Sequence, residues 1–214
     1  MAHRALILLL ALAACGPGKP AEDAKAKASA RPSAWNATGE SWGKFHSKRF
    51  NLTIPLPDGK AWKIDDHKGP ALVATHAATG SVLVVETTQE EELVNRQRCE
   101  ERARNLGWVP NPRLTTVEDH VLTGPDAYDS RLWVALDPDH ADTRVDGHVY
   151  LFGAFLRRCL LVHLTTSIAT AKDEDILATR LAIASDRIVK AIAPDAPRTG
   201  EDAVVPRAPA EIRR

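Results

Sequence analysis

The sequence has no excess of charge of either sign and no apolar run long enough to cross a membrane. Its 28 Lys and Arg residues balance 28 Asp and Glu residues, whereas a nucleic-acid-binding domain usually carries a basic excess on one face. The longest apolar run, Ala5–Ala14, has about ten residues, and a membrane-spanning helix needs roughly 20. These two deficits argue against a nucleic-acid-binding protein and against a membrane-spanning one.

Several short motifs of enzyme chemistry are also missing. The sequence contains no Gly-x-Gly-x-x-Gly, no phosphate-binding Gly-Lys-Ser/Thr and no His-Glu-x-x-His. It has no Cys-x-x-Cys pair for thiol–disulfide exchange. We therefore expect no catalytic residue, no cofactor and no metal site, and an enzymatic role is less favoured than a binding role.

A short basic start, an apolar run and a cysteine follow one another at the beginning of the chain. His3 and Arg4 precede the run Ala5–Ala14, which has the length of a signal-peptide hydrophobic region and ends directly at Cys15. The stretch Leu12-Ala13-Ala14-Cys15 resembles a bacterial lipobox. An ordinary secretory signal with an incidental cysteine is the alternative interpretation.

The lipobox resemblance implies a lipoprotein whose signal peptide, residues 1–14, is removed before Cys15. Cys15 would then carry diacylglycerol and an acylated amine, with fatty acids such as palmitate. Two or more acyl chains anchor a protein stably to a membrane without spanning it. Gly16 stands where enterobacterial lipoproteins kept in the inner membrane have Asp, which favours the outer membrane of the cell envelope. The periplasmic or surface side and the oligomeric state stay open.

Composition divides the rest of the chain into three parts. Residues 15–41 are rich in Ala, Lys, Pro, Gly and Ser, and residues 194–214 hold prolines without apolar periodicity. Neither stretch has enough apolar surface to offset the entropy of ordering, so we expect a disordered tether and a disordered tail. Residues 42–193 form one domain, and a chain of about 150 residues buries about two thirds of its extended surface.

Within this domain, strand-like runs alternate with two helical patterns. Gly80 separates two apolar runs and predicts a hairpin turn. Residues 87–107 have Glu at the start and Arg toward the end, the charge order that a helix dipole favours. Residues 170–193 carry an apolar stripe, with Thr170 and Asp173 as a cap. Strands, helix, strands, helix in this order predict a single α+β domain with a mainly antiparallel sheet.

The last strand-like run is apolar on both of its faces. Leu160, Val162 and Leu164 alternate with Cys159 and Leu161, and a strand that is apolar on both faces is covered on both. We therefore expect helices on each side of the sheet.

The order of these segments is similar to that of a known family. A Phe-x-Leu-x-Ile-Pro strand at residues 50–55, Trp62, a Thr-Gly-Ser-Val-Leu-Val-Val arm at residues 79–85 and the long terminal helix resemble the PsbP-like fold, an α/β/α sandwich. The resemblance covers residues 44–193. The family shares a fold and no single activity, so it implies no functional residue here.

The three cysteines of the chain are Cys15, Cys99 and Cys159. With Cys15 lipidated, Cys99 and Cys159 remain in an oxidising compartment, where an even number favours a bridge. Cys99 lies on the inner stripe of the predicted first helix and Cys159 on a strand that this helix covers. We predict a disulfide between them, and two separate buried thiols are the alternative.

Other polar and aromatic candidates carry weaker signals. The loop at residues 137–146 has four Asp residues, ligands that Ca²⁺ prefers, but not the spacing of an EF-hand, so we interpret it as a solvated loop. His148 and His163 are predicted to lie nearly opposite each other across a hairpin, and the spacing supplies no third zinc ligand. Trp108 is a candidate for an exposed contact.

These observations predict a lipid-anchored cell-envelope protein that acts as a non-catalytic binding or accessory module for a protein partner. An exposed apolar patch would support this hypothesis. A periplasmic carrier or sensor of a small ligand or metal is the alternative, and it requires a deep pocket. An envelope hydrolase is a third hypothesis, and it requires His and acidic side chains that converge with shifted pKa values.

Overall fold

The computed structural model describes residue 35 and residues 41–110, 112–123, 129–137 and 144–194. All of them belong to one compact unit, Pro32–Arg214. Cys15, the predicted signal peptide and most of the predicted tether and tail lie outside the described residues. None of the helices within the described ranges has the length and apolar character needed to cross a membrane.

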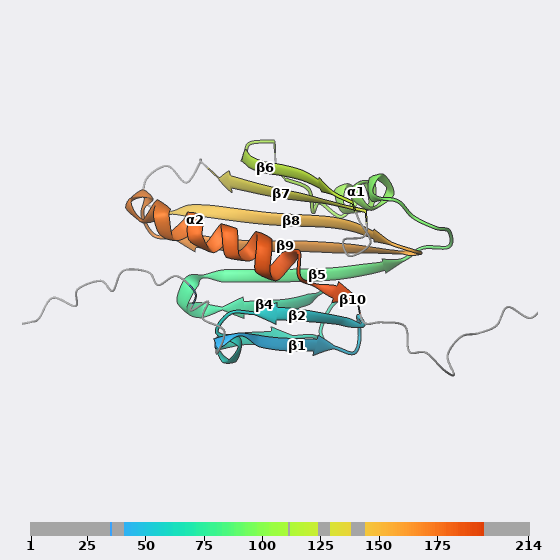
Figure 1. Ribbon diagram of the computed structural model, residues 1–214, viewed down its shortest axis with the longest axis horizontal. Coiled ribbons are helices and arrows are strands. Elements are labelled where there is room, and N and C mark those ends of the chain that lie inside the picture. Colours follow the sequence, from blue (N-terminus) through green and yellow to red (C-terminus); the bar gives the residue numbers. More distant parts are fainter. Residues whose placement is uncertain (1–34, 36–40, 111, 124–128, 138–143, 195–214) are drawn as a thin grey trace, which may run out of the picture. The chain divides into compact units, whose positions relative to one another are not determined.

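The larger of two antiparallel sheets has seven strands in the order β3-β4-β5-β9-β8-β7-β6 (Figure 1). Its strands are β3 (Trp62–Asp65), β4 (Leu72–His76), β5 (Ser81–Gln89), β6 (Thr115–Leu122), β7 (Ser130–Asp137), β8 (Val145–Phe155) and β9 (Arg158–Ile168). The smaller sheet consists of β1 (Gly43–Ser47), β2 (Leu52–Leu56) and β10 (Ala193–Pro194). Every pairing in both sheets is antiparallel, including that of β5 with β9, which are far apart in the chain.

Two helices accompany the sheets. The first, α1 (Arg96–Asn105), lies near the turn between β8 and β9, and the second, α2 (Glu174–Ile183), crosses β8 and β9 (Figure 1). A π-helical segment, Ala184–Val189, continues α2. Short 3₁₀ turns occupy Gly59–Ala61, Ala77–Thr79 and Ala171–Asp173.

The two faces of β9 belong to two separate cores, as its sequence predicts. Leu160, Val162 and Leu164 pack in the larger core with residues of α2 and the smaller sheet. Cys159 and Leu161 pack in a second core with residues of α1. The prediction of a single α+β domain with a mainly antiparallel sheet and a helix on each side is confirmed.

The first helix is shorter than the sequence predicts. Residues 87–89 continue β5 and pair with β9 as far as Arg158, because the ladder continues to the hairpin turn and overrides the helical charge pattern. The helix begins only after Asn95, whose side chain accepts a hydrogen bond from the backbone N–H of Arg98. Residues 90–95 therefore form a loop rather than the first turns of a helix.

Trp35 lies within residues 15–41, which the sequence predicts to be a disordered tether, and its side chain is only 3 % exposed and belongs to the larger core. Its Nε1 donates a hydrogen bond to Oγ1 of Thr79 over 3.0 Å, and its ring lies 6.1 Å from that of Trp62. One tryptophan buries about 150–250 Å², and the average composition of a 27-residue segment does not reveal this contribution. At the other end, Pro194 pairs with β2 one residue beyond the predicted domain boundary.

The indole N–H of Trp35 binds to the first of three buried hydroxyl groups that are hydrogen-bonded in series, those of Thr79, Ser81 and Thr166. Oγ of Ser81 donates to Oγ1 of Thr166, so the proton that Ser81 and Thr79 share comes from Thr79. Each hydroxyl has one proton, and therefore Thr79 accepts from Trp35 and from Nδ1 of His76. Burial lowers the pKa of His76, which favours the neutral ring with its proton on Nδ1.

Substitution of Trp35 by Ala is expected to lower the free energy of unfolding by about 3–5 kcal/mol, the usual cost of removing a buried tryptophan. Substitution by Phe retains most of the apolar area and loses the hydrogen bond to Thr79, so a loss of about 1–3 kcal/mol is expected. Urea unfolding of the full chain measures both. A Trp35→Ala variant as stable as the wild type would show that Trp35 does not pack in solution.

Candidate functional site

The structure joins Cys99 of α1 to Cys159 of β9 by a disulfide bond. Their Cα atoms are 5.3 Å apart, and both side chains are fully buried in the second core. The bond closes a chain segment of 60 residues. It attaches the first half of α1 to the end of β9 that adjoins the β8–β9 turn.

Ion pairs hold the same helix against β7. The carboxylate of Glu100 is buried and binds two guanidinium groups, Arg96 at 2.9 Å and Arg131 at 3.1 Å. Arg131 also binds Asp119 of β6 at 2.8 Å and lies over the ring of Trp133 at 3.9 Å. The hydrogen bonds from Arg131 lower the pKa of the Asp119 carboxyl group. α1 and the loop before it are thus fixed relative to the sheet.

Loss of the disulfide through a Cys99→Ser, Cys159→Ser double substitution is expected to lower the free energy of unfolding by about 4 kcal/mol, from the entropy of closing a loop of this length. Equilibrium unfolding of both forms tests the magnitude. Mass mapping of peptides from cells, without a reducing agent, tests whether the bridge forms there. Free thiols at both positions in the native protein would contradict the assignment.

The turn between β8 and β9 places a leucine in an unusual conformation. The turn consists of Leu156 and Arg157, between the paired residues Phe155 and Arg158. Leu156 has φ +54° and its side chain is 68 % exposed. In two-residue hairpin turns the first position with positive φ favours Gly, which has no Cβ to crowd the backbone.

The loop before α1 lies directly on this turn. The backbone N–H groups of Glu90 and Val94 donate to the carbonyl oxygens of Arg157 and Leu156, each over 2.8 Å. Leu93, next to Val94, is 73 % exposed. Leu93 and Leu156, which we call the leucine tip, are the two most exposed large apolar residues that the structure describes.

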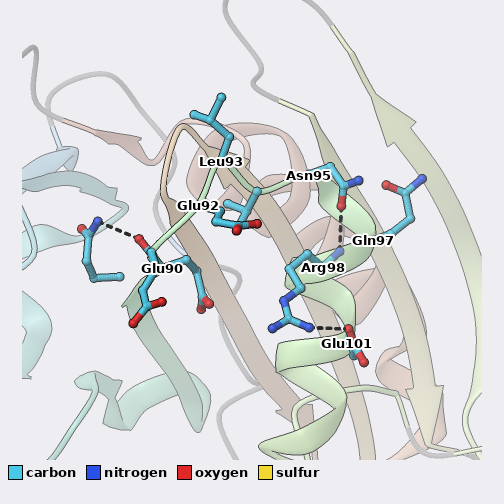
Figure 2. A pocket seen from close by; sticks show the side chains of 10 residues that line it. Glu90, Glu92, Leu93, Asn95, Gln97, Arg98 and Glu101 are labelled. Atoms are coloured by element: carbon cyan, nitrogen blue, oxygen red, sulfur yellow. Dashed lines mark hydrogen bonds and ion pairs between the residues drawn. The ribbon is translucent and has the colours of Figure 1, made fainter.

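A cavity of about 800 Å³ opens beside the leucine tip (Figure 2). Its lining is mostly polar and includes four glutamates: Gln89, Glu90, Glu91, Glu92, Leu93, Val94, Asn95, Gln97, Arg98 and Glu101. Arg98 pairs with Glu101 at 3.0 Å. The lining includes neither His nor Cys, so it offers no nucleophile with an adjacent base and no soft metal ligand.

Histidines form a second polar group, on the α1 side of the sheet. Nδ1 of His148 on β8 lies 3.1 Å from Nε2 of His163 on β9. Oγ1 of Thr165 lies 3.2 Å from the His163 nitrogen and 3.5 Å from the His148 nitrogen. The ring of Tyr150 stacks on that of His163 with centroids 4.2 Å apart. We call His148, His163 and Thr165 the histidine cluster.

The two histidines are diagonal neighbours, whereas the sequence predicts them nearly opposite. His148 pairs with Thr165, and His163 pairs with Tyr150. His163 therefore lies two residues along β9 from the position opposite His148, close to the arrangement that the sequence predicts. The hairpin itself was predicted.

Burial changes the titration of the cluster. Burial, and next the proximity of His148, lower the pKa of His163 to about 4. Burial lowers the pKa of His148 as well, against the attraction of Asp146 and Asp137. Burial raises the pKa of Tyr150 to about 12. All three side chains are therefore neutral near pH 7.

This shift predicts a pH-dependent stability. Between the folded pKa of about 4 and the ordinary value of 6.5, the unfolded chain binds more protons, so stability falls as the pH decreases through this interval and falls no further below it. The His163 contribution amounts to roughly 3 kcal/mol at about 1.4 kcal/mol per unit. Urea unfolding at neutral and acidic pH should show a steeper loss for the wild type than for His163→Gln. Identical pH profiles would contradict a neutral, buried His163.

The remaining candidates lie elsewhere or form no site. Most of the acidic loop lies outside the described residues, and its last member, Asp146, pairs with Arg144 at 2.7 Å. Trp108 is half-buried against the second core, so it is less exposed than predicted. Across the described ranges, no group of three or more His, Cys, Asp and Glu side chains could hold a metal ion.

A nucleophile pattern in the sequence has the wrong structural context. Residues 39–43 read Gly-Glu-Ser-Trp-Gly, the spacing of a hydrolase nucleophile elbow, in which the serine sits on a turn between a strand and a helix. Here Ser41 lies two residues before the first residue of β1, and among the described residues no helix follows it there. The pattern therefore does not indicate a hydrolase.

No protein-family model matches the sequence, and no curated protein matches it significantly. Solved structures with a similar chain path include the Ran-binding protein Mog1p of Saccharomyces cerevisiae, at 11 % identity and a TM-score of 0.47 over 72 % of this chain and 95 % of that one. LpqN of Mycobacterium tuberculosis, described as involved in cell envelope biogenesis, has 10 % identity and a TM-score of 0.44 over 72 % and 91 %. A Bacteroides thetaiotaomicron protein has 8 % identity and a TM-score of 0.42 over 73 % and 49 %. At these values the similarities carry no functional argument.

Proposed function

We propose that this protein is a lipid-anchored accessory module of the cell envelope that binds a protein partner through the leucine tip. The observation that carries the proposal is Leu156, a large apolar side chain that is 68 % exposed at a positive-φ position of a tight turn. Folding alone favours Gly at this position.

The backbone conformation of Leu156 destabilises the fold, and no burial of the Leu156 side chain within the domain compensates for this cost. A left-handed conformation costs a residue with a Cβ roughly 1–2 kcal/mol, and the exposed side chain contributes little burial in compensation. Strained residues of this kind are retained where they serve binding or catalysis. The described residues that line the adjacent cavity include no Ser, Cys or His nucleophile, and we propose binding as the role of the turn.

The leucine tip is held in place, as an interaction site requires. Two backbone hydrogen bonds join its loops, and the disulfide at Cys159 lies three residues after Leu156. A partner therefore meets a surface that is already ordered, which lowers the entropy lost on binding.

The charges around the tip indicate a polar rim of both signs. Arg157 and Arg158 are exposed on the turn, and Glu91 and Glu92 are exposed on the loop before α1. An apolar centre with a mixed-charge rim is the usual anatomy of a protein–protein interface. We therefore expect a partner with an apolar depression that has charges of both signs at its edge.

The anchor in this proposal rests on the lipobox at Leu12-Ala13-Ala14-Cys15. Trp35 is the first described residue of the domain, so 19 residues separate it from Cys15, and a flexible chain of that length reaches about 25 Å on average. This distance allows the leucine tip to meet partners near the membrane surface. Gly16 supports an outer-membrane location in the cell envelope.

Crosslinking in the native cells, followed by quantitative mass spectrometry, tests the proposal. Leu156→Gly and Leu93→Ser are expected to reduce the recovery of a stoichiometric partner by about tenfold, the effect of a contact worth ~1.4 kcal/mol. Leu106→Ser, at a leucine on the far end of α1 that is 39 % exposed, is the matched control and should retain the partner.

Leu156→Gly should at the same time stabilise the domain by about 1 kcal/mol, because Gly relieves the backbone strain. A Leu156→Gly variant that is more stable than the wild type but no longer recovers the partner would show that Leu156 serves binding and not folding. Recovery of the same partner by all three variants would refute the leucine tip as the interface. Retention of a Cys15→Ala variant in the membrane fraction would refute the lipid anchor.

A further inference from the structure

We infer that the histidine cluster, His148, His163 and Thr165, is a binding site for a divalent first-row transition metal, with Cu²⁺ bound more tightly than Zn²⁺. This inference goes beyond the proposed function and uses a different surface. His163 lies five residues along β9 from the first strand residue after the turn, about 17 Å at the rise of a strand.

The spacing of the three ligand atoms fits a four-coordinate metal. Nδ1 of His148, Nε2 of His163 and Oγ1 of Thr165 are separated by 3.1, 3.2 and 3.5 Å. Ligands at about 2.0–2.1 Å from a tetrahedral metal lie about 3.3 Å from one another. The three atoms thus form one face of a coordination tetrahedron, and a water molecule supplies the fourth ligand.

The protons balance without an additional base. In the metal-free form one proton lies between the two facing nitrogen atoms, since neither partner is charged. On metal binding this proton moves to the other nitrogen of the same ring, so that two neutral imidazoles present lone pairs to the ion. A metal ligand must be deprotonated, and the neutral form of each ring provides one nitrogen without a proton.

The surroundings of the cluster favour a cation over a purely structural hydrogen bond. The carboxylates of Asp146 and Asp137 act on His148 with negative charge. Tyr150 packs on His163 and fixes its ring.

The chemistry of the ligands selects the metal. Imidazole nitrogen suits Zn, Cu and Ni, and affinities of nitrogen sites follow the order in which Cu²⁺ exceeds Ni²⁺ and Zn²⁺. A site with two histidines and one neutral hydroxyl adds no negative ligand charge, so it is not suited to Ca²⁺ or Mg²⁺, which prefer carboxylate and carbonyl oxygens.

Calorimetric titration of the purified full chain with Cu²⁺ and with Zn²⁺ tests the site. One equivalent of Cu²⁺ should bind, Zn²⁺ should bind more weakly, and electron paramagnetic resonance of the Cu²⁺ form should show two imidazole nitrogens. His163→Gln and His148→Gln should each weaken Cu²⁺ binding at least about tenfold, because loss of even an outer-shell partner of a ligand costs about 10–100-fold in metal affinity. Thr165→Val should weaken it less.

His120→Gln is the matched control, because His120 is an exposed strand histidine outside the cluster, and it should bind as the wild type does. Thermal unfolding without metal verifies that each variant is folded, and either histidine variant alone suffices for the test. Absence of a one-to-one Cu²⁺ complex in the wild type would overturn the inference. Unchanged affinity in a folded His163→Gln or His148→Gln variant would overturn it as well.

Discussion

The burial of β9 on both of its faces is the constraint that organises the domain. Eleven residues of this strand extend over about 36 Å at the rise of a strand, and apolar side chains on both faces require cover from both sides. On one side α2, its π-helical continuation and the smaller sheet provide it. On the other side α1 has only 10 residues, about 15 Å of helix. The part of β9 that α1 does not reach contains His163 and Thr165, so the histidine cluster exists because the covering helix is shorter than the strand.

Much of this architecture could be predicted because it depends on periodicities within the chain. Alternation in β9 predicts two cores, and the charge order around residue 99 predicts a helix over the sheet. The first residue of that helix could not be predicted in the same way. Residues 87–89 are in a strand because they form backbone hydrogen bonds with β9, which is far away in the sequence. The burial of Trp35 could not be predicted from its neighbours in the sequence, because the side chain is held by a hydrogen bond to Thr79, 44 residues away.

The candidate sites were less accessible to prediction. The two histidines were expected to approach each other, because a hairpin between two apolar runs brings such positions together. Thr165 was not expected, since a hydroxyl side chain has no pattern that marks it as a ligand. The leucine tip depends on a backbone angle and an exposed fraction that no motif encodes. A weak signal did exist: Leu156-Arg157 stands between two strand-like runs, where Gly or Asn is usual.

The position of Trp35 determines which contact of the domain breaks first when a force pulls on the chain that precedes it. A pull on the preceding residues first loads the contact of this single side chain with Thr79, because β1 begins only at Gly43. Release of the tryptophan frees the chain no further than Trp42, which packs against the larger core and under the guanidinium group of Arg187, so the gain is at most about 25 Å for seven residues, while both sheets remain paired. The domain therefore has a weak mechanical element in series with a strong one, and moderate forces lengthen its attachment before they unfold it.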